Sequence, residues 1–155
     1  MKFKAAPLDG RLKRDTTALV VILLLLAAYF VFRAIKISSY SHWFLALFPL
    51  LIIILAYLYQ PVSYEIENGF LKMNQRIKSQ SIKISEIKSW EHFIDLKSFE
   101  TKGSGKFFGY VGKPEENEYW CATNKHKILK IITSKEVFFI SPSEIEEFKI
   151  HLKRN

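Results

Sequence analysis

The chain has 155 residues, of which 49% are apolar and 25% are charged, and its formal net charge is +8. A chain of this length accommodates one apolar block and a single domain of about 100 residues, and it excludes two full-sized globular domains. The positive charge excludes an acidic chain. The one cysteine, Cys121, excludes both an internal disulfide framework and a cysteine-rich zinc site.

The first elements predicted along the chain are two apolar helices at residues 16–32 and 43–59, which contain no Asp, Glu, Lys, Arg or His. Each segment would extend roughly 25 Å as an α-helix, near the short end of the range for crossing a bilayer. Two buried core helices are the alternative, but the rest of the chain is too small to enclose helices that are apolar on every side. We therefore predict a transmembrane hairpin over residues 16–59. The lack of charged residues and histidine inside the two spans argues against a transporter.

The distribution of cations predicts the orientation of this hairpin. Residues 1–15 carry five cations, whereas the connection 33–42 carries only Arg33 and Lys36. Lys and Arg are retained on the cytoplasmic side of a membrane. The sequence therefore predicts a multi-pass protein of the inner (plasma) membrane, with a basic cytoplasmic N-terminus at 1–15, an external connection, and a cytoplasmic domain at 60–155.

Beyond Pro61 the pattern changes to the alternation of apolar and polar residues that is typical of β-strands. Asn68-Gly69 is a residue pair favoured in two-residue hairpin turns. Strands are predicted at 62–67, 70–73, 81–84, 88–94, 107–111, 118–123, 128–133 and 137–140. Short strands at this spacing indicate an antiparallel sandwich or small barrel.

A single helix is predicted after the last strand. Ser141-Pro142-Ser143-Glu144 carries the signals of a helix start, with Ser141 as the cap and Pro142 at the first helical position. Ile145, Phe148 and Leu152 follow at helical spacing and form one apolar face. We expect this helix to cover one end or face of the strands.

Several segments of the chain stand out in combination: residues 64–73, which include the Asn68-Gly69 turn, then 85–87, 107–112, and Ser141-Pro142 ahead of Phe148. Together with the two N-terminal spans, they resemble the bacterial pleckstrin-homology-like (PH-like) membrane proteins. The resemblance implies a mainly β domain of about seven strands in a partly open barrel with a C-terminal capping helix. It implies no catalytic residues. Eukaryotic relatives of the fold can bind phosphoinositides through basic residues of their first strands, but no matching basic motif is present here.

No constellation of residues in the sequence predicts a catalytic, cofactor or metal site. The four histidines are scattered without metal-ligand spacing. Cys121 lies in a predicted strand, where a small buried side chain is expected. The Gly-Ser-Gly-Lys segment 103–106 departs from the phosphate-loop pattern, because Phe107 replaces the required Ser or Thr. We therefore expect a protein that is not an enzyme and takes no cofactor. An enzyme acting on lipid or peptidoglycan precursors is a weaker alternative.

Four cations lie close together after the second span and are candidates for contact with anionic lipid headgroups: Lys72, Arg76, Lys78 and Lys83. Each would contribute about 1 kcal/mol near such a surface. A solvated strand edge is the alternative interpretation. Residues 60–155 contain 16 cations and 13 acids, so their net charge is only +3. Nucleic-acid binding is not expected, because it requires a stronger basic patch with exposed aromatic side chains.

The sequence leaves two main functions open. The first is a non-enzymatic membrane protein whose cytoplasmic PH-like domain binds a protein partner, or a second copy of the chain, through a groove or an edge strand. The second is a membrane-surface module that senses anionic lipids through the segment Lys72–Lys83 and the cations of the N-terminus.

Overall fold

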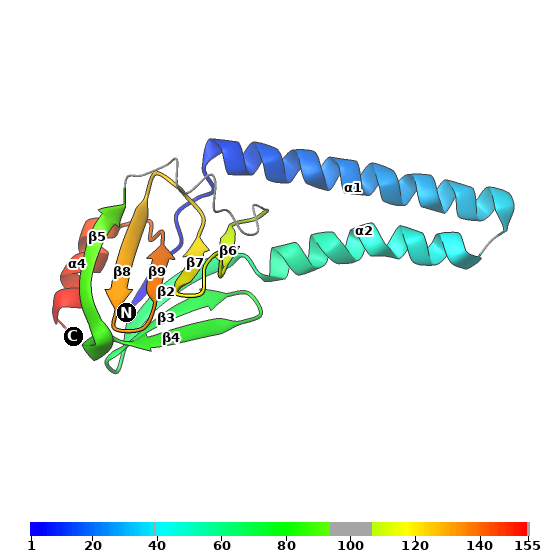
Figure 1. Cartoon of the computed structure of the whole chain (residues 1–155). Coiled ribbons are helices and arrows are strands. Elements are labelled where there is room, and N and C mark those ends of the chain that lie inside the picture. The colour runs from blue at the N-terminus through cyan, green and yellow to red at the C-terminus, as the bar shows by residue number, and fades with distance from the viewer. Residues whose placement is uncertain (39, 94–106, 155) are drawn as a thin grey trace.

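A helical hairpin projects from a β domain in the computed structural model (Figure 1). The structure describes residues 1–38, 40–93 and 107–154, so the segment 103–106 discussed above lies outside the described residues. The hairpin consists of α1 (Gly10–Ile37) and α2 (Tyr40–Leu58). The β domain contains, in chain order, β1 (Lys2–Lys4), β2 (Pro61–Glu67), β3 (Phe70–Gln75), β4 (Ser79–Lys83), the 3-10 turn η1 (Ile84–Glu86), β5 (Ile87–Phe93), β6 (Tyr110–Gly112), β7 (Glu118–Ala122), β8 (Ile128–Thr133), β9 (Val137–Ile140) and α4 (Ile145–Arg154).

The two hairpin helices pack side by side and turn most of their apolar side chains outward (Figure 1). Small buried residues, among them Ala27, Ala34 and Ala46, let the backbones approach closely. Only 11% of the most apolar window of each helix is buried, which is unlike a core helix. Both helices are long and apolar enough to cross a membrane.

Helix α1 is longer than the apolar segment predicted at 16–32. Its start is fixed by Asp9, whose carboxylate accepts a hydrogen bond from the Leu12 backbone N–H at 2.9 Å. Its end is fixed by Ser38, which adopts the left-handed conformation with φ of 52°. These capping residues, and not the ends of the apolar run, set the length of the helix. Helix α2 likewise begins ahead of the predicted residues 43–59.

The first sheet has the strand order β1-β2-β3-β4, and all its neighbours are antiparallel. The predicted turn at Asn68-Gly69 is confirmed, and both residues have positive φ, 51° and 74°. Strand β1 is an addition to the prediction, which treated residues 1–15 only as a basic N-terminus. Phe3 of this strand is buried while the lysines on either side face outward. The hairpin is therefore inserted between two paired strands, β1 and β2.

The second sheet has the order β5-β8-β9-β7-β6. β9 pairs antiparallel with β8 but parallel with β7, so the expectation of a purely antiparallel arrangement was wrong. The parallel pairing arises because the tight β8–β9 hairpin places β9 between β8 and β7. Strand β6 starts later than the predicted 107–111, because Phe108 has a φ of 59°, which is incompatible with a strand.

Alternate residues of the second sheet enter two different cores. Cys121, Ile131 and Phe138 face the first sheet and α4. Trp120, Ile128 and Phe139 face the other way and pack with Leu12 of α1. Both faces of this sheet are therefore buried, which explains why its strands are apolar at consecutive positions. The base of α1 is part of the domain's packing.

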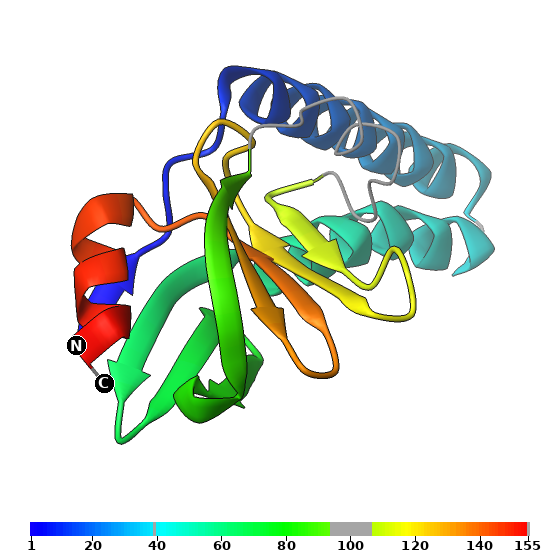
Figure 2. The same cartoon turned by 60° about the vertical axis from the view of Figure 1, so that its left-hand side comes forward.

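Helix α4 closes the first core through Phe148 and Leu152, which are almost fully buried. It lies on the opposite side of the β domain from the hairpin (Figure 2). The predicted start was wrong, since the helix begins at Ile145. Ser141 does not cap it, because its side-chain oxygen accepts a hydrogen bond from the Thr123 backbone N–H at 2.7 Å.

The mainly β, PH-like architecture with a C-terminal helix is confirmed, but the two sheets do not close into a barrel. Each described sheet retains two edge strands. The first ends at β1 and β4, and the second at β5 and β6. The turn η1 connects β4 of one sheet to β5 of the other.

Candidate functional site

Strand β4 is an open edge of the first sheet. In its ladder with β3, the Ile84 N–H donates to the Gly69 carbonyl and the Gln75 N–H donates to the Lys78 carbonyl. Because hydrogen-bonded pairs alternate along an antiparallel ladder, the even-numbered residues of β4 face β3. The backbone N–H and C=O groups of Ser79, Ser81 and Lys83 therefore face away from the sheet.

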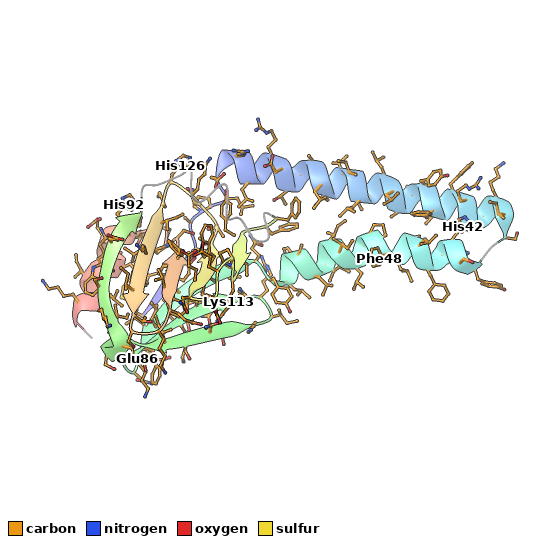
Figure 3. The ribbon with its side chains drawn as sticks, in the orientation of Figure 1. His42, Phe48, Glu86, His92, Lys113 and His126 are labelled. Carbon is orange, nitrogen blue, oxygen red and sulfur yellow. The ribbon has the colours of Figure 1, made fainter. Side chains whose placement is uncertain are left out.

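A groove of about 430 Å³ lies beside this edge, and we call it the β4 groove. Its apolar lining comes from both sheets, through Phe70, Ile82 and Phe138. Its charged lining is balanced, with the cations Lys83 and Lys135 and the acids Glu86 and Glu136. Glu86 marks this region at the end of the β domain away from the hairpin (Figure 3). The arrangement combines an unpaired backbone edge with apolar and charged side chains of both signs.

The N-terminal segment is tied to the β domain through Asp9. Besides capping α1, its carboxylate accepts hydrogen bonds from the Tyr110 hydroxyl at 3.1 Å and from the Lys125 backbone N–H at 3.2 Å. Asp9 is only 4% exposed. One buried carboxylate thus joins the helix start, strand β6 and the β7–β8 connection.

The turn between β3 and β4 lies against the end of α2. The Arg76 guanidinium is 4.1 Å from the centre of the Tyr57 ring, and the Ile77 N–H donates to the Leu58 carbonyl at 3.2 Å. Tyr57 also packs edge-on against Phe108, whose N–H donates to the Thr16 hydroxyl at 3.2 Å. These contacts, together with Asp9, hold the base of the hairpin in a fixed position on the β domain.

The structure does not bring the four predicted lipid-contact cations together. Arg76 and Lys78 lie at the β3–β4 turn, next to the end of α2. Lys72 lies farther along β3 and forms an ion pair of 3.3 Å with Glu67. Lys83 lies at the other end of β4 and lines the β4 groove. The set therefore divides into a pair near the hairpin and a pair away from it.

A second groove, of about 370 Å³, lies between β1, the segment that follows it, and the start of β2. We call it the basic groove, because its charged lining consists of Lys2, Lys4 and Arg76. Gln60 and Pro61, which follow the end of α2 by two and three residues, are also in its lining. The sequence prediction missed this groove, since Lys4 and Arg76 are far apart in the chain. Only the pairing of β1 with β2 brings them to one surface.

The buried chemistry-bearing groups belong to the core. Burial raises the pKa of the Cys121 thiol to about 12 and also raises that of Tyr119 to about 12. A thiol in this state is not a nucleophile at neutral pH. Among the described residues, no cluster of three or more His, Cys, Asp or Glu has the geometry of a metal site. His42 lies at the far end of the hairpin, while His92 and His126 lie on the β domain (Figure 3).

A comparison with protein-family models shows the family to which this chain belongs. The model described as "Bacterial PH domain" matches residues 62–155, which is more than half of the chain. The chain belongs to the bacterial PH-domain family. Comparisons with curated proteins and with solved structures give no match.

The match confirms the resemblance seen in the sequence. The matched segment of this bacterial PH domain begins at Val62, in β2. Strand β1 lies outside the matched residues, yet it pairs with β2 and contributes Phe3 to the core. In this chain the PH domain is thus extended by a strand that precedes the hairpin.

Proposed function

We propose that this protein is a non-enzymatic membrane module whose PH domain binds an extended segment of a protein partner, or of a second copy of the chain, along β4. The observation that carries the proposal is the open edge of β4, where Ser79, Ser81 and Lys83 turn their backbone groups away from β3. An added strand would pair with these groups through main-chain hydrogen bonds, which require no signature residues. This accounts for a function without a catalytic constellation.

The β4 groove would give such binding its selectivity. Alternate side chains of an added strand point to opposite faces, so every second one would enter the groove. Phe70, Ile82 and Phe138 favour apolar side chains there. The cations and acids on its rim favour a partner segment that carries charges of both signs, and like charges would disfavour the wrong register.

The proposal places the hairpin across the membrane and the β domain at its cytoplasmic surface. Two observations support it: the excess of cations before the first span, and the pairing of β1 with β2, which requires both ends of the hairpin to lie on the same side. A reporter that works only in the cytoplasm, fused after Asn155, should be active. Activity only outside the cytoplasm would overturn the orientation.

Site-specific photo-crosslinking in the full chain tests the binding edge. A photoreactive residue at Ser81, in native membranes, should give a discrete adduct, whereas the same residue at Lys153 on α4 should not. Ser79→Pro should abolish the adduct, because it removes an outward-facing donor of β4 without removing a β3–β4 hydrogen bond. Ser79→Ala, which keeps the donor, is the matched control. An adduct that survives Ser79→Pro, or no adduct at Ser81, would refute strand addition.

A second candidate function is contact with the anionic leaflet, and the position of Arg76 and Lys78 beside the end of α2 favours it. Ile77 lies between them and is 60% exposed. A spin label at Ile77→Cys should collide with a nickel chelate on lipid headgroups more often than a label at Asn68→Cys, in the β2–β3 turn. Equal collision rates would contradict a membrane-facing β3–β4 turn.

A further inference from the structure

The basic groove differs from the β4 groove in the charge of its lining. The β4 groove has two cations and two acids, whereas the basic groove has three cations and no acid in its lining. Its neutral polar lining includes Gln60 and Ser63. A concave surface with this composition attracts an anion and offers it hydrogen-bond donors.

The cross-strand register explains why Lys2 of this groove is paired with an acid while Lys4 is not. Lys2 lies opposite Glu65 and forms an ion pair of 2.9 Å with it. Lys4 lies opposite Ser63 on β2, and Ser63 lies opposite Asn74 on β3. The cross-strand neighbours of Lys4 in this sheet are therefore neutral. Among the residues that the structure describes, no recorded ion pair involves Lys4.

Arg76 is oriented by an aromatic ring and not by an acid. Its guanidinium lies over the face of Tyr57, at 4.1 Å from the ring centre. Stacking uses the face of the guanidinium plane and leaves its N–H groups, which lie in that plane, available to an anion. Forked N–H donors of this kind match the oxygens of a phosphate group.

The groove also lies at the level where headgroups are expected. Its lining residues Gln60 and Pro61 follow the end of α2 by two and three residues, and Tyr57 and Tyr59 at the end of that helix are 43% and 47% exposed. Tyrosines are enriched where a spanning helix meets the membrane surface. The groove therefore opens beside the end of the second candidate span.

We propose that the basic groove binds the phosphate of an anionic phospholipid headgroup, with Lys4 and Arg76 as the residues that hold it. This inference rests on the membrane placement proposed above but not on strand addition at β4. It replaces the diffuse set Lys72, Arg76, Lys78 and Lys83 with a defined site that includes a cation from the N-terminal strand.

The test uses the full chain in a mild detergent, titrated with phosphatidylglycerol, phosphatidylcholine or inorganic phosphate, with bound lipid counted by native mass spectrometry. We expect one phosphatidylglycerol to bind before any phosphatidylcholine. Each cation near an anionic group contributes roughly a fivefold factor in affinity. The double variant Lys4→Gln with Arg76→Gln should therefore weaken binding about 25-fold. Lys4→Arg with Arg76→Lys, which keeps both charges, should restore most of it.

The matched control is Lys88→Gln with Lys153→Gln, which removes the same charge at two exposed positions, on β5 and α4, that line neither groove. It should leave the phosphatidylglycerol affinity within about twofold of that of the unchanged chain. An equal loss in the control would refute a defined site, and equal binding of phosphatidylcholine would refute a preference for anionic lipid. Inorganic phosphate that displaces the lipid at equal concentration would refute the assignment to a lipid headgroup. Ser79→Pro should leave this titration unchanged, so a failure of strand addition and a failure of headgroup binding are distinguishable.

Discussion

The hairpin and the β domain place the same kinds of side chain in opposite environments. In α2, Phe44 and Phe48 are 74% and 63% exposed, whereas in α4 Phe148 is fully buried between the sheets. The β domain thus obtains its stability by removing apolar surface from water within the chain. The hairpin leaves its apolar surface outside, as two helices that are long and apolar enough to cross a membrane would. A phenylalanine therefore stabilises the folded core in the β domain, whereas in the hairpin it lies on the outer surface.

The boundary between these regions is built from polar and aromatic contacts. Asp9, Thr16, Tyr57 and Arg76 connect the ends of the helices to the strands and their connections. Single contacts of this kind at an exposed surface are weak, but Asp9 is buried and makes several. Among these four residues we therefore expect substitution at Asp9 to have the largest effect.

The largest expected difference in the free energy of unfolding is between substitutions of two phenylalanines, one in each region. Phe148→Ala should destabilise the β domain by about 3–5 kcal/mol, because it leaves a cavity in the core. Phe48→Ala, on the outward face of α2 (Figure 3), should change the same quantity by less than about 0.5 kcal/mol. Urea unfolding in mild detergent, followed by tryptophan fluorescence, measures both. Similar losses would mean that the two regions do not differ as described.

The next effect concerns the buried carboxylate at the boundary. Asp9→Ala should cost about 2–4 kcal/mol, because it removes a helix cap and the buried carboxylate that accepts hydrogen bonds from the Tyr110 hydroxyl and the Lys125 N–H. Asp15→Ala is the matched control, since the Asp15 side chain is 46% exposed and should contribute less than about 0.5 kcal/mol. The same unfolding assay applies. An equal cost at the two positions would argue against a special role for Asp9.

A smaller effect is expected where two segments approach closely. A Cβ at Gly109 would lie 2.7 Å from Pro61 Cδ and 3.2 Å from the Ala122 carbonyl oxygen. Gly109→Ala should therefore cost about 1–3 kcal/mol through overpacking. A Cβ at Gly10 meets nothing within 4 Å, and Gly10→Ala should cause no loss. Thermal unfolding of the two variants checks the contrast, and a neutral Gly109→Ala would show that the segments separate readily.

The smallest effect lies on the surface of the first sheet. The hydrogen bond from Lys2 lowers the pKa of Glu65 below its usual value. A lowered pKa means that the stabilisation is present above the unfolded-state pKa and is lost as the pH falls through the folded-state pKa. Glu65→Gln should cost about 0.2–1 kcal/mol at pH 7. The difference from the unchanged chain should disappear in acid, and a constant difference between pH 7 and pH 3 would contradict the ion pair.

The sequence predicted the elements whose signals are local. The Asn68-Gly69 turn, the short strands and both apolar helices follow from neighbouring residues, and the structure contains them. Strand β1 was not predicted, because three residues are too few to establish an alternation. The parallel pairing of β7 with β9 was not predicted either, since it depends on which strands meet after folding.

The candidate sites were less predictable for the same reason. Arg76 and Lys78 lie beside the end of α2, but sequence distance also grouped them with Lys72 and Lys83, which lie elsewhere. Lys4 was interpreted as an orientation signal and, with the other N-terminal cations, as part of an anionic-lipid sensor, but it was not predicted to lie beside Arg76. Its place in the basic groove depends on a strand pairing that spans the whole hairpin.

The insertion of the hairpin between β1 and β2 also constrains the order in which the chain is made. Strand β1 is synthesised first, but its partner β2 emerges from the ribosome only after both helices, since Phe3 is paired with Tyr64. The core cannot be completed until that partner is available, because Phe3 packs against Phe148 at a ring distance of 5.1 Å. Completion of the β domain is therefore coupled to prior translation of the hairpin. A chain whose two helices fail to pack side by side would keep β1 away from β2.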